Sequence, residues 1–113
     1  MACVEFVRKG RTGIVRLNRP ERLNAMSSKL TGELHTVLLD TNHDPDVKVI
    51  ILTGNGKAFC SGDDLKEFAQ QSDSPESIVH HIEGIQRVTR DLMYSSKLVV
   101  GAVHGYAVGG GFE

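Results

Sequence analysis

The sequence predicts an α/β protein in which short strands alternate with amphipathic helices. Three observations support this fold class. Two runs rich in β-branched residues, 4–7 and 13–17, flank the turn-prone stretch RKGRTG. A helical period then begins near Ser27, and the apolar run 47–53 is followed by a second, longer helical pattern. The order hairpin, helix, strand, loop, helix, strand indicates α/β layering.

The first half of the chain divides into a hairpin, a turn and a helix. The two β-branched runs predict an antiparallel hairpin. In NRPERLNAM, Pro20 fixes its own backbone and pushes Arg19 towards an extended conformation, so the strand pattern ends there. The helix that follows has Ser27 or Ser28 as its expected N-cap. Its apolar face consists of Leu30, Leu34, Val37 and Leu38.

The second half repeats a strand and a helix and then enters another strand. Residues 47–53 carry β-branched side chains on both faces, which predicts a strand covered on both sides. Ser74-Pro75-Glu76 is typical of a helix start. The apolar face of that helix is expected to contain Ile78, Ile82, Ile85 and Leu92. Residues 98–103 then predict a second buried strand.

Composition bounds the class of protein. The 113 residues are 40% hydrophobic and 24% charged with a net charge of −1, which is typical of one globular domain. Lys and Arg are scattered, so we expect neither nucleic acid nor a membrane surface as a partner. No signal-peptide pattern or apolar run of membrane-spanning length is visible, which predicts a cytoplasmic protein. Cys3 and Cys60 are interpreted as free thiols, with a single disulfide left open.

Two glycine-containing loops follow the predicted buried strands. One is GNGKAFCSGDDLKEF, from residue 54, and the other is HGYAVGGGFE, from residue 104. Each is expected to present backbone N–H groups at the start of a helix. Two such groups pointing at one position stabilise an oxygen that gains negative charge during a reaction. Glu113, three residues after Gly110, would serve as a general acid or base, so the pattern predicts an oxyanion hole for an acyl compound.

The same residues are compatible with other interpretations. Isolated glycines are most often plain turn residues. A nucleophilic role for Cys60 is rejected because no base is identifiable beside it. The five histidines show no metal-ligand spacing, so no metal site is predicted. The stretch GNGKAFCSG lacks the Gly-Lys-Ser/Thr ending of a phosphate-binding loop.

Three successive motifs resemble those of the enoyl-CoA hydratase/isomerase (crotonase) family. They are LNRPERLNAM, AFCSGDDLKEF and GYAVGGGFE, in the family's order and covering essentially the whole chain. The resemblance implies an α/β fold of β-β-α units wound into a spiral. Residues 1–113 would form the N-terminal portion of one such domain, incomplete at the C-terminus. It also implies a homotrimer or a dimer of trimers for the complete protein.

The resemblance further implies which residues form the site. The backbone N–H groups of Asp63 and Gly110 would bind the thioester oxygen, and Glu113 would be the first catalytic glutamate. The residues expected to contact the coenzyme A portion are Arg22, Leu23, Ser61, Asp63, Asp64, Leu65 and Lys66, together with Gly110. No separate cofactor is expected, because coenzyme A enters as part of the substrate.

The implied activity is hydration of an enoyl-CoA, as in fatty-acid β-oxidation. The alternatives are an isomerase or acyl-CoA hydrolase of the same family, or a non-catalytic homologue or fragment that binds CoA thioesters. Two departures bear on the choice: Asp63 stands where the family commonly has Ala, and the second glutamate of hydratases lies beyond Glu113. The isolated 113-residue chain is therefore expected to be inactive.

Overall fold

A four-stranded sheet forms the base of the molecule in the computed structural model, which describes residues 2–64, 66–67 and 75–111. Its strand order is β1-β2-β3-β5. The strands are β1 (Val4–Lys9), β2 (Thr12–Leu17), β3 (Val49–Gly54) and β5 (Leu98–Gly101). β1 and β2 pair antiparallel, as the predicted hairpin requires, whereas β2, β3 and β5 pair parallel.

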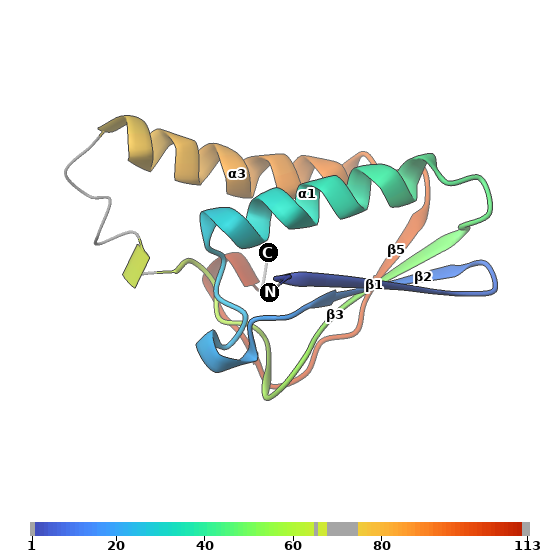
Figure 1. The fold of residues 1–113 in the computed structure, drawn as a ribbon, viewed down its shortest axis with the longest axis horizontal. Coiled ribbons are helices and arrows are strands. Elements are labelled where there is room, and N and C mark those ends of the chain that lie inside the picture. The colour runs from blue at the N-terminus through green and yellow to red at the C-terminus, as the bar shows by residue number, and fades with distance from the viewer. Residues whose placement is uncertain (1, 65, 68–74, 112–113) are drawn as a thin grey trace.

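Two helices cover one face of this sheet. They are α1 (Ser28–His43) and α3 (Pro75–Met93), which lie side by side (Figure 1). The predicted cap of α1 is confirmed at Ser27, whose Oγ accepts a hydrogen bond from the Leu30 N–H at 3.1 Å. α3 begins at the predicted Pro75, while the predicted cap Ser74 lies outside the described residues.

A second, smaller sheet pairs β4 (Ala58–Cys60) with β6 (Tyr106–Ala107) in parallel. β3 and β4 precede one helix, and β5 and β6 precede the short 3₁₀ turn η2 (Gly109–Gly111). Corresponding strands of successive units therefore lie next to each other. This stacking of β-β-α units is the α/β arrangement that the family resemblance implied.

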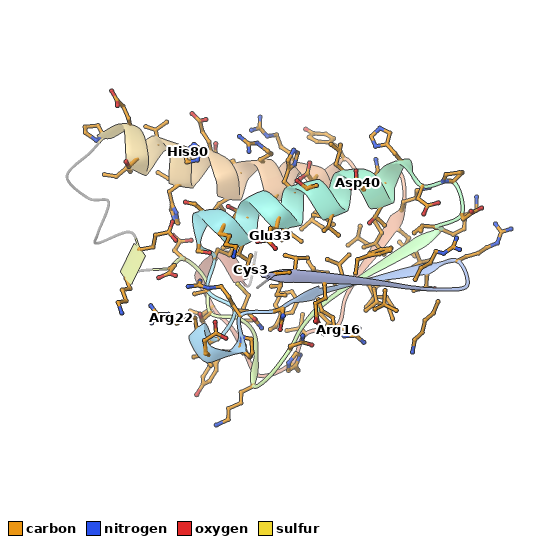
Figure 2. All side chains as sticks on the ribbon, viewed as in Figure 1. Cys3, Arg16, Arg22, Glu33, Asp40 and His80 are labelled. Atoms are coloured by element: carbon orange, nitrogen blue, oxygen red, sulfur yellow. The ribbon has the colours of Figure 1, made fainter. Side chains whose placement is uncertain are left out.

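The core lies between the four-stranded sheet and the two helices. It contains Val15, Leu17, Ile50 and Leu52 from the sheet, Leu30, Leu34 and Leu38 from α1, and Val88 from α3. Side chains alternate along each strand, so Arg16 lies on the side of the sheet away from the helices (Figure 2). Figure 2 also shows Glu33 above Cys3, whose N–H donates to Glu33 Oε1 at 2.8 Å.

Three expectations about burial were wrong. β3 buries only one face, and Val49, Ile51 and Thr53 on the other are half-buried. β5 is largely exposed, with Leu98 66% accessible, because it lies at the edge of the sheet rather than inside it. On α3, Ile85 and Leu92 pack against the core as predicted, but Ile82 is 45% exposed.

The part of the chain that the structure describes contains no helix long and apolar enough to cross a membrane. Within the same residues, no group of three His, Cys, Asp or Glu side chains gathers in a way that could hold a metal ion. Cys3 and Cys60 are both buried free thiols. Burial raises the pKa of the Cys60 thiol, which disfavours the thiolate that a nucleophile would need.

Candidate active site

The two glycine-containing loops are neighbours because β4 pairs with β6. Ala58 lies opposite Tyr106, and Cys60 lies opposite Ala107. The Val108 N–H donates to the Cys60 carbonyl oxygen at 3.2 Å, which continues the contact beyond the strands. Both loops were expected to leave the strands at 47–53 and 98–103 directly. They do follow β3 and β5, and each contains a short strand that was not predicted, β4 in the first loop and β6 in the second.

Gly111 brings the second loop into close contact with the first. A Cβ atom built on Gly111 would overlap the carbonyl oxygen of Cys60 and lie 2.9 Å from the Cys60 Cβ. Only a residue without a side chain fits this approach. The turn that contains Gly110 is therefore held against the end of β4.

The backbone of Asp63 faces the side of its loop that is away from Met26. Asp63 forms an isolated parallel bridge with Met26, in which the Met26 N–H donates to Gly62 O at 2.7 Å and the Asp64 N–H donates to Met26 O at 3.3 Å. In a parallel bridge the central residue directs its own N–H and C=O to the opposite side. The Asp63 N–H donates no hydrogen bond to any residue that the structure describes. It is therefore available to a ligand.

Two of the predicted site residues, Leu65 and Glu113, lie outside the described residues. Gly110 lies within the 3₁₀ turn η2. The predicted roles of all three, like that of Asp63, stay predictions of the sequence.

Arg22 is the last residue of η1 (Pro20–Arg22) (Figure 2), and Leu23 follows it directly. Leu23 has a left-handed backbone with φ of 52°, and the residue is 37% exposed. Its carbonyl oxygen accepts a hydrogen bond from the Ser61 N–H at 3.0 Å. The two segments that the sequence analysis assigned to coenzyme A are thus in direct contact.

Asp64 is a buried acid that joins the same two segments. Its side chain is 4% exposed, and its Oδ2 lies 2.9 Å from Arg19 Nη1. Its Oδ1 accepts the Glu67 N–H at 3.1 Å and lies 3.8 Å from Arg22 Nη2. Burial alone would raise the pKa of Asp64, but the Glu67 amide and the two guanidinium groups together lower it below its ordinary value. Asp64 is therefore a structural anion that caps residues 66–67.

Beyond Asp64, the predicted Lys66 is exposed, so its ammonium group is accessible to an anion. The next residue, Glu67, points back to the start of α1. Its Oε1 accepts hydrogen bonds from the Ser28 N–H at 3.0 Å and the Ser28 hydroxyl at 2.7 Å.

Sequence reasoning did not identify Arg19, Asn24 or Glu67 as part of this site. Arg19 and Asn24 stand in the quoted motif LNRPERLNAM, and Glu67 stands in AFCSGDDLKEF. Their positions within these motifs could therefore have pointed to a role in the site. Their partners are distant in sequence, however, and only the fold reveals them.

An apolar cavity of about 270 Å³ lies between the sheet and the helices. Its walls include Met26 and Cys60 from the site, Gly111 from η2, and Val88 and Leu92 from α3. The site is thus bordered on one side by apolar side chains.

These features define an α/β protein built from repeated β-β-α units, with two backbone loops meeting beside an apolar cavity. The sequence model of the enoyl-CoA hydratase/isomerase family matches residues 9–113. The chain belongs to this family.

Relatives and solved structures agree with that assignment. A probable mitochondrial enoyl-CoA hydratase from Dictyostelium discoideum is 40% identical over 106 residues, covering 94% of this chain and 37% of the relative. A hydroxycinnamoyl-CoA hydratase-lyase from Pseudomonas fluorescens is 41% identical over 100 residues, covering 86% and 36%. The crystal structure of an enoyl-CoA hydratase from Bacillus anthracis superposes with a TM-score of 0.90 at 31% identity, covering 96% and 42%. The chain therefore spans about two fifths of the length of these proteins.

Proposed function

We propose that the full-length protein containing this segment hydrates the double bond of an enoyl-CoA thioester. The observation that carries the proposal is the pairing of β4 with β6. This pairing brings the loop of Asp63 and the turn of Gly110 to the same end of two adjacent parallel strands. Ligand sites in α/β proteins commonly lie at such strand ends.

In this proposal, the N–H groups of Asp63 and Gly110 bind the thioester oxygen. Water adds its oxygen to the β-carbon, and the electron pair of the double bond moves towards the thioester, so that negative charge develops on the bound oxygen. The water gives up one of its protons to an acid/base group as its oxygen adds, and one proton is delivered to the α-carbon, so that H and OH of one water are added in all. Donors held in place before the reaction stabilise this charge because they need no reorganisation.

Glu113 would position the water and transfer a proton, with a second acid supplied from outside this segment. The support for Glu113 is its place three residues after Gly110 and the family resemblance. The support for an acyl substrate is the apolar cavity that borders Cys60 and Gly111, since such a cavity suits a hydrocarbon chain.

The CoA portion is proposed to lie across the segment that contains Arg22, Leu23 and Ser61, with Asp64, Leu65 and Lys66 beside it. The exposed ammonium of Lys66 and the partly exposed guanidinium of Arg22 carry the positive charge that a phosphate group needs. No cofactor other than the CoA of the substrate is required. We therefore expect a Lys66→Ala variant to bind the CoA ester more weakly than the wild-type protein at low salt.

The test is an assay of the full-length protein with short- and medium-chain enoyl-CoA substrates. Formation of the 3-hydroxyacyl-CoA supports the hydratase proposal. A shifted double bond would indicate an isomerase, and release of free CoA would indicate a hydrolase. Tight binding of the thioester without turnover would indicate a non-catalytic CoA-ester-binding protein.

We also propose that the full-length protein assembles as a homotrimer or a dimer of trimers, on the strength of the family resemblance. Light scattering during size-exclusion chromatography measures the mass of the assembly directly. A mass equal to one chain would contradict this proposal.

A further inference from the structure

Asn24 is the most constrained polar residue near the candidate site. It has no exposed surface, and its backbone is left-handed with φ of 55°. Asn adopts this conformation more readily than most other residues. A buried side-chain amide is nevertheless stable only when its hydrogen bonds are satisfied. The preceding Leu23 is also left-handed, so the chain turns sharply at this point.

The side chain of Asn24 joins two parts of the chain that are distant in sequence. Its Oδ1 accepts the Arg19 N–H at 2.8 Å. Its Nδ2 donates to Asn55 O at 3.0 Å and to Ala58 O at 2.9 Å. Asn24 therefore ties the segment between β2 and α1 to the turn that leads into β4.

Little free space surrounds this amide. A Cβ atom on Gly54 would lie 2.7 Å from Asn24 Nδ2 and 2.6 Å from the Phe59 carbonyl oxygen. A displaced Asn24 side chain would therefore move the neighbouring backbone rather than occupy a void.

The residues next to Asn24 hold the backbone around Asp63. On one side, the Leu23 carbonyl accepts the Ser61 N–H at 3.0 Å. On the other, the Met26 N–H donates to Gly62 O at 2.7 Å, and Met26 O accepts the Asp64 N–H at 3.3 Å. These hydrogen bonds lie before and after Asp63, so they determine the direction of its N–H. Their own position depends on the anchor that Asn24 provides.

We propose that Asn24 is a positioning residue that aims the Asp63 amide at the thioester oxygen. This inference rests on the proposed function. Asn24 does not touch the substrate in this scheme, and it acts through Leu23, Met26 and the backbone of residues 61–64. A misplacement of about 1 Å in a reacting geometry lowers the rate by about 10²-fold.

The test compares Asn24→Gly with Asn24→Asp in the full-length protein. Glycine adopts the left-handed backbone without strain, so Asn24→Gly isolates the loss of the side chain. Asn24→Asp keeps the acceptor for the Arg19 N–H but removes both donors. Asn42→Ala is the matched control, because Asn42 Oδ1 accepts the Ser96 N–H at 2.9 Å and the Ser95 hydroxyl at 3.2 Å at the end of α1, away from Asp63.

Two readouts separate positioning from simple stability. One is the division of any loss between kcat and KM. The other is the absorbance of a bound aryl enoyl-CoA with an electron-donating ring substituent, which moves to longer wavelength when its thioester oxygen is polarised. Asn24→Gly is expected to lower kcat by about 10²-fold, with little change in KM, and to reduce the absorbance shift per bound ligand. The folded Asn42→Ala variant should retain both properties.

The outcomes are distinct. If the folded Asn24→Gly protein keeps the wild-type kcat and the full absorbance shift, the inference is wrong while the proposed function stands. If Asn24→Gly does not fold, Asn24→Asp decides by the same two readouts. If the wild-type protein neither binds the aryl enoyl-CoA nor hydrates any enoyl-CoA, the proposed function itself fails.

Discussion

Replacing Asp63 with proline removes one backbone N–H from the proposed oxyanion hole, and none of the described hydrogen bonds of its loop uses that N–H. No described residue accepts a hydrogen bond from this N–H, and the bridge to Met26 uses Gly62 O and the Asp64 N–H instead. The substitution therefore removes no donor or acceptor of the hydrogen bonds that hold the loop. Proline lacks the backbone donor that the thioester oxygen would need.

The expected loss follows from the cost of deleting one oxyanion donor. Such a deletion lowers kcat by about 10²–10³-fold, or about 2.7–4 kcal/mol of transition-state stabilisation. Asp63→Ala is the matched control, because the Asp63 side chain is exposed and its removal keeps the N–H. Alanine is expected to preserve or raise turnover, since it removes a carboxylate near a developing negative charge.

The assay follows hydration of an enoyl-CoA by full-length variants through the loss of ultraviolet absorbance of the conjugated thioester. Circular dichroism establishes that each variant is folded. A folded Asp63→Pro variant with wild-type kcat would refute the role of this amide. An Asp63→Ala variant as impaired as a Glu113→Gln variant would show that the side chain, not the amide, is used.

Two further predictions concern the packing of the site. Gly111→Ala should lower kcat, because the added Cβ would overlap the Cys60 carbonyl and force the second loop away from β4. Steady-state kinetics of a variant with an unchanged melting temperature measures the effect, and a wild-type kcat would contradict the prediction. Asp64→Asn should destabilise the protein by about 1.5–3 kcal/mol at neutral pH, the range for hydrogen bonds to charged groups. Because the folded-state pKa of Asp64 is lowered from 3.8, the wild-type advantage is fully present above pH 3.8 and disappears as the pH falls through the folded-state pKa. Urea unfolding of both proteins across this range measures the difference, and a constant difference down to the acid limit would contradict the assignment.

Local patterns were sufficient to predict the larger elements. The β-branched runs of the hairpin are recognisable without any tertiary contact. Ser27 caps α1 through a hydrogen bond to a residue only three positions away. The alternation of strands with helices also followed from these patterns, whereas the β-β-α units were implied only by the family resemblance.

The short strands β4 and β6 could not be predicted in the same way. They contain three and two residues, and they exist because they pair across more than forty positions of the chain. The sequence therefore indicated two glycine-containing loops but not the short strands within them that bring the loops together.

In the candidate site, too, the local features could be predicted and the long-range contacts could not. Gly62 and Gly110 stand out in the sequence because glycine-rich loops are recognisable locally. The anchoring role of Asn24 depends on Ala58, and the charge balance of Asp64 depends on Arg19, each more than thirty residues away. Long-range polar contacts of this kind leave no periodic pattern.

Hydratase activity is tested most directly by incubating the full-length protein with a short-chain trans-2-enoyl-CoA and identifying the product by mass and by the position of its hydroxyl group. We predict a 3-hydroxyacyl-CoA, heavier than the substrate by one water, formed with multiple turnovers per active site. Stoichiometric binding of the enoyl-CoA with no hydrated product would contradict the central claim.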